Sequence, residues 1–273
     1  MRSMHARLAS VALRSCSKSV SCPVVEQLGA RSCNVMSLRN ESYTVDIGDM
    51  RVKYKDRNET FTEDSLTSKE PIGQFKAWFE KACNTPQIME PNAMFLATAT
   101  RDGVPSVRAV LLKGFGTDGF KFCTNYESRK GRELAENPNA ALTFYWESLN
   151  RSVRIEGIAK KTSAEYSDRY FQSRPYGSQI GSMASKQSSV IASRQTLIVK
   201  ERELLAQFPE NQVKRPAHWG CYLVVPHSVE FWQGQSDRLH DRIRFRRPKA
   251  DEKIDNILLH QGEDGWVYER LSP

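Results

Sequence analysis

Cations beside hydrogen-bonding side chains occur at four places in the sequence, and each could bind a phosphate. The first is NYESRKGREL, residues 125–134, where Ser128 is a good N-cap for a helix that runs to about residue 137. Arg129 and Lys130 would stand in the first helical turn, where the helix dipole disfavours cations. An anion held by these cations and by the free backbone amides would reverse that penalty. The alternative is a pair of solvated surface cations.

The second place is SVRAVLLK, residues 106–113. Arg108 interrupts an apolar strand pattern, and a buried cation needs a partner. Because side chains alternate along a strand, Arg108 and Lys113 point to opposite faces unless a bulge intervenes, and they could serve different phosphates. The alternative is an arginine on an edge strand, followed by a lysine that ends the strand.

The third place is YFQSRPYGS, residues 170–178, which combines a tyrosine, an arginine and a serine around an expected turn. Pro175 and Gly177 are expected to break the preceding helix beside Arg174 and Ser178. A phenol, a guanidinium and a hydroxyl around a turn could surround a phosphate with charge-assisted hydrogen bonds. Loops of this composition are also common without any ligand.

The fourth place is VEFWQGQSDRLHDR, residues 229–242. If its second half is extended, Arg238, His240 and Arg242 share one face. Two guanidinium groups flanking an imidazole suit a dianionic or electron-rich ligand, and Trp232 adds a flat apolar wall. The alternative is a basic, solvated strand face, because alternating arginines continue beyond this segment.

Strands joined by turns, with helices outside them, are expected to position these groups. Residues 71–84, PIGQFKAWFEKACN, carry apolar residues at helical spacing, and further helices are expected over 163–172 and from about 193 to 207. Closely spaced strands favour an antiparallel barrel over a doubly wound parallel sheet, which predicts one α+β domain. The expected strands span residues 93–100, 106–113, 120–124, 141–146, 152–160, 220–232, 239–246 and 265–271.

Composition is that of an ordinary globular chain with a basic balance. Of 273 residues, 39% are hydrophobic and 26% are charged, and 40 lysines and arginines against 32 acids give a formal charge of +8. This charge suits an anionic partner, but it does not separate nucleic acid, a membrane surface and phosphorylated metabolites. No stretch approaches the roughly 20 apolar residues that a membrane span needs, so we expect a soluble protein.

Residues 1–48 differ in composition from the rest and are interpreted as a disordered or targeting segment, with the folded domain at 49–273. Up to residue 40 the segment is rich in arginine and serine, and Glu26 is its only acid. That composition is typical of a mitochondrial transit peptide, and a variable tail is the alternative. We therefore expect a cytoplasmic or mitochondrial location.

The six cysteines form no C-x-x-C pair, and no histidine stands at metal-ligand spacing beside them. We therefore expect free thiols, a reducing compartment and no metal site. The cysteines are Cys16, Cys22, Cys33, Cys83, Cys123 and Cys221.

The segment VEFWQGQSDRLHDR resembles the signature of the pyridoxamine 5'-phosphate oxidase family. The chain ends in YERLSP, which is similar to the family's closing segment. The likeness continues in order through RAVLLKGF, FCTNYESRKGREL, FYWESLNRSVRIEG, YFQSRPYGSQIG and KQSSVI, and it covers roughly residues 50–273. It implies an α+β FMN-binding split barrel with surrounding helices and a C-terminal region for dimerisation and substrate binding. It also implies a homodimer with one FMN at each subunit boundary, and no nucleic-acid or membrane partner.

The resemblance further implies oxidation of pyridoxamine or pyridoxine 5'-phosphate at C4', with hydride transfer to flavin N5. Oxygen is the acceptor, and the products are pyridoxal 5'-phosphate and hydrogen peroxide. The implied substrate residues are Lys113, Tyr170, Arg174, Ser178, Arg238, Leu239 and His240, of which Arg238 and His240 are the catalytic, positioning pair. The implied FMN residues are Arg108, Ala109, Val110, Leu111, Cys123, Thr124, Arg129, Lys130, Ser152, Gln187, Ser188, Trp232 and Arg242.

Two segments depart from the family pattern. Ser152 stands where the family usually has a flavin-contacting glutamine, and a serine offers one hydroxyl in place of a longer amide. This difference predicts weaker FMN binding than in close relatives. Residues 55–58 occupy a segment that can fold over the substrate in the family, but they match it poorly.

Three other functions remain open from the residues. A split-barrel flavoprotein with another substrate would keep the FMN residues but lose Tyr170, Arg174, Ser178 and Arg238, which are present here. A non-catalytic carrier of pyridoxal phosphate would bind product without consuming oxygen. A nucleic-acid binder would show steep salt dependence and no yellow colour.

Overall fold

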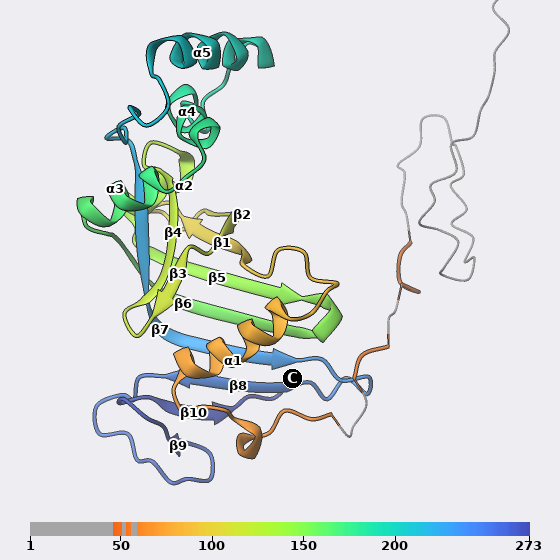
Figure 1. Cartoon of the computed structure of the whole chain (residues 1–273). Coiled ribbons are helices and arrows are strands. Elements are labelled where there is room, and N and C mark those ends of the chain that lie inside the picture. The colour runs from red at the N-terminus through yellow and green to blue at the C-terminus, as the bar shows by residue number, and fades with distance from the viewer. Residues whose placement is uncertain (1–45, 51–52, 56–58) are drawn as a thin grey trace, which may run out of the picture. The chain divides into compact units, whose positions relative to one another are not determined.

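Figure 1 shows a computed structural model of the chain, which describes residues 46–50, 53–55 and 59–273. The chain divides into two compact units, residues 1–51 and 52–273. In the first unit, the backbone N–H of Met50 donates to the carbonyl of Ile47 in a turn, at 3.0 Å. Nearly all of the N-terminal segment predicted at 1–48, including Cys16, Cys22 and Cys33, lies outside the described residues, so that prediction stays open.

A ten-stranded antiparallel sheet forms the body of the second unit (Figure 1). Part of it closes into a barrel: β1 pairs with β2 and β5, β5 with β6, β6 with β7, β7 with β4, and β4 with β3, which follows β2. The predicted antiparallel barrel is therefore confirmed. The strands are β1 (Ala93–Ala99), β2 (Pro105–Leu111), β3 (Gly114–Gly116), β4 (Gly119–Asn125), β5 (Asn139–Trp146), β6 (Arg151–Lys161), β7 (Trp219–Gln233), β8 (Asp241–Arg246), β9 (His260–Gln261) and β10 (Val267–Arg270).

Strand β7 is shared between the barrel and an extension of the sheet. Along one edge, its first half pairs with β4 and its second half pairs with β8. Its other edge pairs with β6 over nearly the whole length, interrupted by a register shift between Glu156 and Gly157. Strands β10 and β9 continue the sheet beyond β8. Because β7 is 15 residues long, its two ends lie far apart on the molecule.

Helix α1 (Pro71–Cys83) packs its apolar face on the barrel interior, as the sequence spacing predicts. Phe75 is fully buried, with ring centroids 5.0 Å from Phe120 and 5.1 Å from Phe144. The side chain of Glu70 caps the helix by accepting from two free backbone N–H groups of the first turn. Two 3₁₀ helices, η2 (Glu63–Ser65) and η3 (Glu147–Leu149), complete this part.

The other helices pack at the end of the barrel where β7 begins (Figure 1). They are α2 (Arg129–Glu136), α3 (Ala164–Gln172), α4 (Tyr176–Ala184) and α5 (Arg194–Gln207). A second apolar cluster joins them, with Phe171, Ile180 and Leu204 buried against Trp219 of β7. Ser128 caps α2 as predicted, since its hydroxyl accepts from the backbone N–H of Gly131.

The helix break predicted at Pro175 and Gly177 is only partly correct. Helix α3 does end at Gln172, but a new helix begins at once, with Pro175 in the N-cap position and Gly177 inside α4. Proline is tolerated at a helix start because its fixed φ suits it and the missing N–H has no partner there. Ser178 therefore lies in the first turn of a helix and not in a loop.

The described residues contain neither a candidate membrane span nor a candidate metal site. No helix in this part of the chain is long and apolar enough to cross a bilayer. No group of three or more His, Cys, Asp and Glu side chains among these residues could hold a metal ion.

The prediction of free thiols is wrong for two cysteines. Antiparallel pairing of β4 with β7 places Cys123 directly opposite Cys221, and the two form a disulfide across 98 residues of sequence. Sequence spacing could not reveal this pair, because strand register alone brings the residues together. Cys83 is free, as predicted, and it is exposed.

Removing this disulfide should destabilise the fold. We expect Cys221→Ser to lower the free energy of unfolding by about 2–4 kcal/mol, because the cross-link restricts a long loop in the unfolded chain. Denaturant titration without reductant measures this change, and Cys83→Ser is the matched control with no expected effect. Full alkylation of Cys123 and Cys221 in the native, unreduced protein would contradict the pairing.

Candidate active site

The first group of predicted site residues meets where α2 packs against β1 and β2. The Arg108 guanidinium donates to the carbonyl of Leu96 at 3.1 Å and to the hydroxyl of Thr98 at 2.6 Å. It also pairs with Glu133 of α2 at 3.4 Å, and Arg129 Nε pairs with the same carboxylate at 2.8 Å. One buried carboxylate therefore joins two predicted FMN residues from different elements.

Glu133 was missed by the sequence reasoning, although it stands four residues after Arg129 on the helix. Its burial raises the pKa, but hydrogen bonds from Ser106, Thr98 and Arg129 outweigh this effect and lower the pKa to about 2. Only 5% of its side chain is exposed. Glu133 is therefore a fixed negative charge inside a cluster of cations.

Lys130 lies next to this cluster but has only neutral hydrogen-bond partners. Its ammonium donates to Gln187 Oε1 at 2.9 Å and to Thr124 Oγ1 at 3.3 Å, and no carboxylate among the described residues forms an ion pair with it. Burial, and then the charge of Arg108, lower the pKa of Lys130 to about 8, against the opposing effect of Glu133. A buried cation without a protein counterion suits an anionic ligand.

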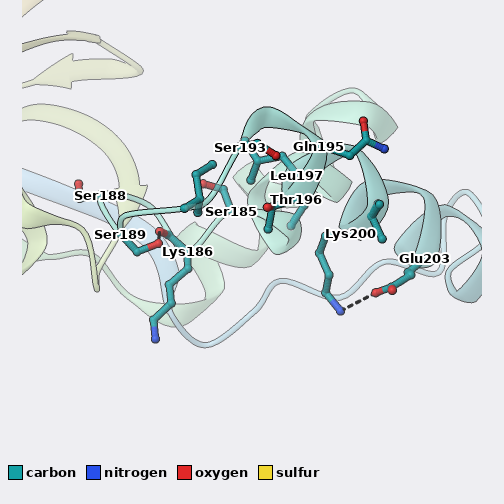
Figure 2. A pocket seen from close by; sticks show the side chains of 13 residues that line it. Ser185, Lys186, Ser188, Ser189, Ser193, Gln195, Thr196, Leu197, Lys200 and Glu203 are labelled. Atoms are coloured by element: carbon teal, nitrogen blue, oxygen red, sulfur yellow. Dashed lines mark hydrogen bonds and ion pairs between the residues drawn. The ribbon is translucent and has the colours of Figure 1, made fainter.

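The remaining predicted FMN residues at this end differ in how they present their side chains. Ala109, Val110 and Leu111 of β2 pair in register with Phe95, Met94 and Ala93 of β1, and no strand of the described chain pairs with the other edge of β2. The sulfur of Cys123 is bonded to Cys221 and packs against the second apolar cluster, so only its backbone could reach a ligand. Ser188 is exposed on a groove of about 690 Å³ between α4 and α5, which Figure 2 shows.

The predicted phosphate residues of the third segment surround Trp219 at the same end of the barrel. The Arg174 guanidinium lies 4.7 Å from the indole ring and donates to Ser182 Oγ at 2.6 Å. The Tyr170 ring stacks on the same indole, with a centroid distance of 6.2 Å. Burial lowers the pKa of Arg174, and no carboxylate of the described chain forms an ion pair with it. The sequence reasoning missed Trp219, because a tryptophan at the start of a predicted strand indicates only a core residue.

Two further predicted substrate residues are Ser178 and Lys113. Ser178 is exposed in the first turn of α4. Lys113 is half-buried just after β2, where its backbone N–H donates to the carbonyl of Lys121 at 2.7 Å. Asn125, at the end of β4, donates to the carbonyl of Ser185 at 3.3 Å and so ties α4 to the barrel end that contains Lys130.

A second group of predicted residues lines a separate cavity of about 400 Å³ near the C-terminus. The rings of Trp232 and His240 lie 4.9 Å apart, and Tyr54 meets both edge-on at 6.1 and 6.0 Å. Arg242 Nε donates to Glu230 at 2.7 Å. Tyr54 and Glu230 were missed by the sequence reasoning. The complete lining is Thr143, Tyr145, Ser152, Arg154, Glu230, Trp232, His240, Arg242 and Pro273.

One ring nitrogen of His240 accepts a hydrogen bond from the backbone, which leaves the other nitrogen to donate. The backbone N–H of Gln235 donates to His240 Nδ1 at 3.0 Å, so the neutral ring bears its proton on Nε2. Burial, and then the charge of Arg238, lower the pKa of His240, while Asp237 and Asp241 oppose them. The imidazole is therefore neutral near pH 7 and presents Nε2–H, which suits positioning and not proton abstraction.

The extended backbone expected through residues 239–246 begins only at Asp241. Arg238 adopts a left-handed conformation with φ of 71°, and Leu239 is 65% exposed, so the segment before β8 is a turn. The prediction that Arg238, His240 and Arg242 share one strand face is therefore wrong. His240 and Arg242 still meet, because both line the cavity with Trp232.

The two groups of site residues lie beside opposite ends of β7, the long strand labelled in Figure 1. Trp219, beside Arg174, begins the strand, and Trp232, beside His240, stands near its end. At about 3.3 Å of rise per residue, the two tryptophans are roughly 40 Å apart. A molecule the size of the substrate could not contact both tryptophans within one chain.

Two family models match the chain. The one described as pyridoxamine 5'-phosphate oxidase covers residues 80–208. The one described as the pyridoxine 5'-phosphate oxidase C-terminal dimerisation region covers residues 219–273. The chain belongs to the pyridoxamine 5'-phosphate oxidase family. The resemblance that the sequence motifs indicated is thereby confirmed, and the split-barrel fold expected of this family agrees with the observed sheet.

Relatives in the family cover most of the chain. A pyridoxine/pyridoxamine 5'-phosphate oxidase of Bombyx mori is 57% identical over 244 residues, which are 89% of this chain and 94% of that protein. A pyridoxine-5'-phosphate oxidase of Bos taurus is 54% identical over 231 residues, which are 84% of this chain and 88% of that protein.

Solved structures agree on the fold. PhzG from Burkholderia lata, determined with tetrahydrophenazine-1-carboxylic acid, matches with a TM-score of 0.67 and 32% identity, over 78% of this chain and 97% of that one. An FMN-binding protein from Nostoc punctiforme related to pyridoxamine 5'-phosphate oxidase matches with a TM-score of 0.55 and 15% identity, over 73% of this chain and 97% of that one. The second likeness concerns the fold alone.

Proposed function

We propose that this chain is an FMN-dependent oxidase that converts pyridoxamine or pyridoxine 5'-phosphate and oxygen to pyridoxal 5'-phosphate and hydrogen peroxide. Family membership and the names of the insect and bovine relatives support this activity and the FMN cofactor. The observation that carries the proposal is a pair of largely buried cations, Lys130 and Arg174, neither of which has an ion-pair partner among the described residues. Two such sites match one phosphate on the cofactor and one on the substrate.

The residues around α2 fit the phosphate of FMN. Arg129 uses Nε to pair with Glu133, while its two terminal nitrogens have no hydrogen-bond partner in the described chain. Lys130 adds a second cation, Thr124 adds a hydroxyl, and the first turn of α2 adds free backbone amides. A dianionic phosphate would satisfy all three kinds of donor. Gln187 and Ser188 extend this set from the segment after α4.

The other FMN residues are proposed to come from a second subunit. Ser152, Trp232 and Arg242 line the cavity near the C-terminus, at the far end of β7 from Lys130. Strand pairing places Ser152 opposite Tyr145 and Trp232, so this cavity opens on the outer face of the sheet. A homodimer in which each subunit supplies one end of the site, with FMN at the boundary, brings both groups together.

Exposed apolar side chains on the same face support this dimer. Phe95 is 52% exposed, Val107 is 66% exposed and Tyr145 is 48% exposed. The registers of β1 with β2 and β5 put all three on one face, because paired residues share a face and alternate residues repeat it. Such a patch next to a cavity marks an interface, and the C-terminal dimerisation region of the family agrees with it.

The residues of this chain bind and orient the reactants, while FMN supplies the redox chemistry when bound. Tyr170, Arg174 and Ser178, with Lys113, would hold the substrate phosphate, and this remote binding fixes the position of C4'. His240 would donate from Nε2 to the pyridine ring or its substituents, with Arg238 and Leu239 beside it. Glu230, the acidic side chain in the cavity lining, is engaged by Arg154 and Arg242 and is not available as a base.

A spectrum and one assay test the proposed function. The purified protein, supplied with FMN, should be yellow and should release peroxide and an aldehyde in equal amounts when pyridoxamine 5'-phosphate is added in air. A protein that stays colourless and cannot be loaded with FMN would overturn the proposal. A yellow protein that consumes no oxygen with either substrate would reject the oxidase activity but keep the cofactor.

Ser152 gives a prediction about cofactor affinity. We expect Ser152→Gln to lower the dissociation constant of FMN about two- to tenfold, because a longer amide can add a hydrogen bond worth roughly 0.5–1.5 kcal/mol. Quenching of FMN fluorescence measures this constant. Ser152→Asn is the matched control, since it has the amide but not the reach. Equal dissociation constants for Ser152→Gln and the original protein would show that the serine does not weaken FMN binding.

A further inference from the structure

Glu133 holds together the cations of the proposed phosphate site. Its carboxylate accepts from the hydroxyls of Thr98 on β1 and Ser106 on β2, and it pairs with Arg108 on β2 and Arg129 on α2. Three elements therefore converge on one side chain that is 95% buried. If Glu133 formed only an ordinary ion pair on the helix surface, its single partner would be Arg129, four residues before it.

The same contacts show that the two arginines have different tasks. Both terminal nitrogens of Arg108 are engaged, with Leu96, Thr98, Ser106 and Glu133, so that among the described residues only its Nε–H has no partner. The Arg129 guanidinium is anchored through Nε alone and keeps its terminal nitrogens. Arg108 is therefore built into the scaffold, whereas Arg129 is oriented with its donors available.

We propose that Glu133 is a positioning residue for FMN: it fixes Arg129 so that its free edge meets the phosphate, and Arg108 holds Glu133 in place. This inference rests on the proposed function, because it assigns the phosphate of FMN to this cluster.

The charge of Glu133 also acts on Lys130. The charged groups near Lys130 are Arg108 from β2 and Glu133 from α2 itself, while Thr124 of β4 and Gln187 after α4 are neutral. Burial and Arg108 lower the pKa of Lys130 to about 8, and Glu133 raises it. Without the carboxylate, Arg108 would repel Lys130 unopposed, so the lysine would lose its proton at a lower pH.

Titration of FMN into the full-length variants Glu133→Gln and Glu133→Asp, from pH 6.5 to 9, tests the proposal. We expect Glu133→Gln to weaken FMN binding about tenfold at pH 7, the loss of one charge-assisted contact. It should also shift to lower pH the point at which affinity begins to fall. Glu133→Asp keeps the charge, so its affinity should begin to fall at the same pH as in the original protein, even if the affinity itself is lower. Glu136→Gln, an exposed residue of the same helix, is the control with no expected change.

Wild-type affinity in Glu133→Gln, or an unchanged pH profile, would overturn the proposal. If Glu133→Gln does not fold, a double-mutant cycle of Glu133→Asp with Arg129→Gln replaces it: coupled losses in FMN affinity support the proposal, and additive losses refute it. The original protein is titrated first. If it binds no FMN, the proposed function fails before any variant is compared.

Discussion

Mixing two defective variants should restore about a quarter of the original activity, because each site is expected to draw on both subunits. The first variant is Arg174→Ala, at a residue that contacts Trp219 at the start of β7, and the second combines Arg238→Ala with His240→Asn, in the turn beside Trp232 near the end of β7. In the mixed dimer, one site collects all the substitutions and the other is intact. Random exchange makes half of the dimers mixed, and each of these has one working site.

The two parent variants should each be nearly inactive at low substrate concentration. Loss of the Arg174 guanidinium removes a charge-assisted contact worth about 1.5–3 kcal/mol, which should raise KM about ten- to a hundredfold with little change in kcat. The peroxide assay is run below the KM of the original protein, so that this defect is visible. Subunits are exchanged by unfolding and refolding together, and differently tagged copies report the fraction of mixed dimers.

A mixture of Arg174→Ala with Tyr170→Phe is the matched control. Both changes lie at the same end of β7, beside Trp219, so every site in their mixed dimer contains one of them. That mixture should stay at the average of its parents. If the first mixture also gives only the average, each site is confined to one chain, and the estimated separation along β7 does not describe the working enzyme.

Most elements of this fold could be predicted because their signals are local. The strand expected at residues 141–146 is observed as β5, whose buried and exposed positions alternate as a half-buried strand requires. The N-cap at Ser128 was correct because a serine hydroxyl accepts from a backbone N–H only three residues away. The helix after Pro175 was missed because proline ends one helix and begins another with the same local signal.

The sequence predicted which residues form the site but not how they are arranged in space. The sequence motifs contain Lys130, Arg174 and His240, yet they do not reveal that the first two lie beside the start of β7 and the third beside its end. The partners that decide their chemistry come from distant segments. Trp219 lies 45 residues after Arg174 in the sequence, and the backbone N–H that fixes the His240 tautomer belongs to Gln235, in a turn that was not predicted. Register, turns and packing are set by the whole chain.

Replacing Lys130 by methionine should weaken FMN binding by about ten- to a hundredfold near pH 7 and should abolish its pH dependence above pH 8. The size of the loss follows from one charge-assisted contact to phosphate. Methionine has a similar length and keeps the apolar part of the buried side chain. Fluorescence titration of FMN between pH 7 and 9 measures both effects.

The direction of the pH effect follows from the burial of Lys130. Its pKa in the ligand-free protein is about 8, and a bound dianion must raise it. Binding above pH 8 therefore takes up a proton, and the affinity should fall by up to about tenfold per pH unit there, while it stays constant below. The variant has no such proton to gain, so its profile should be flat, and Lys81→Met on the exposed side of α1 should behave like the original protein. Parallel profiles for Lys130→Met and the original protein would mean that another group binds the phosphate.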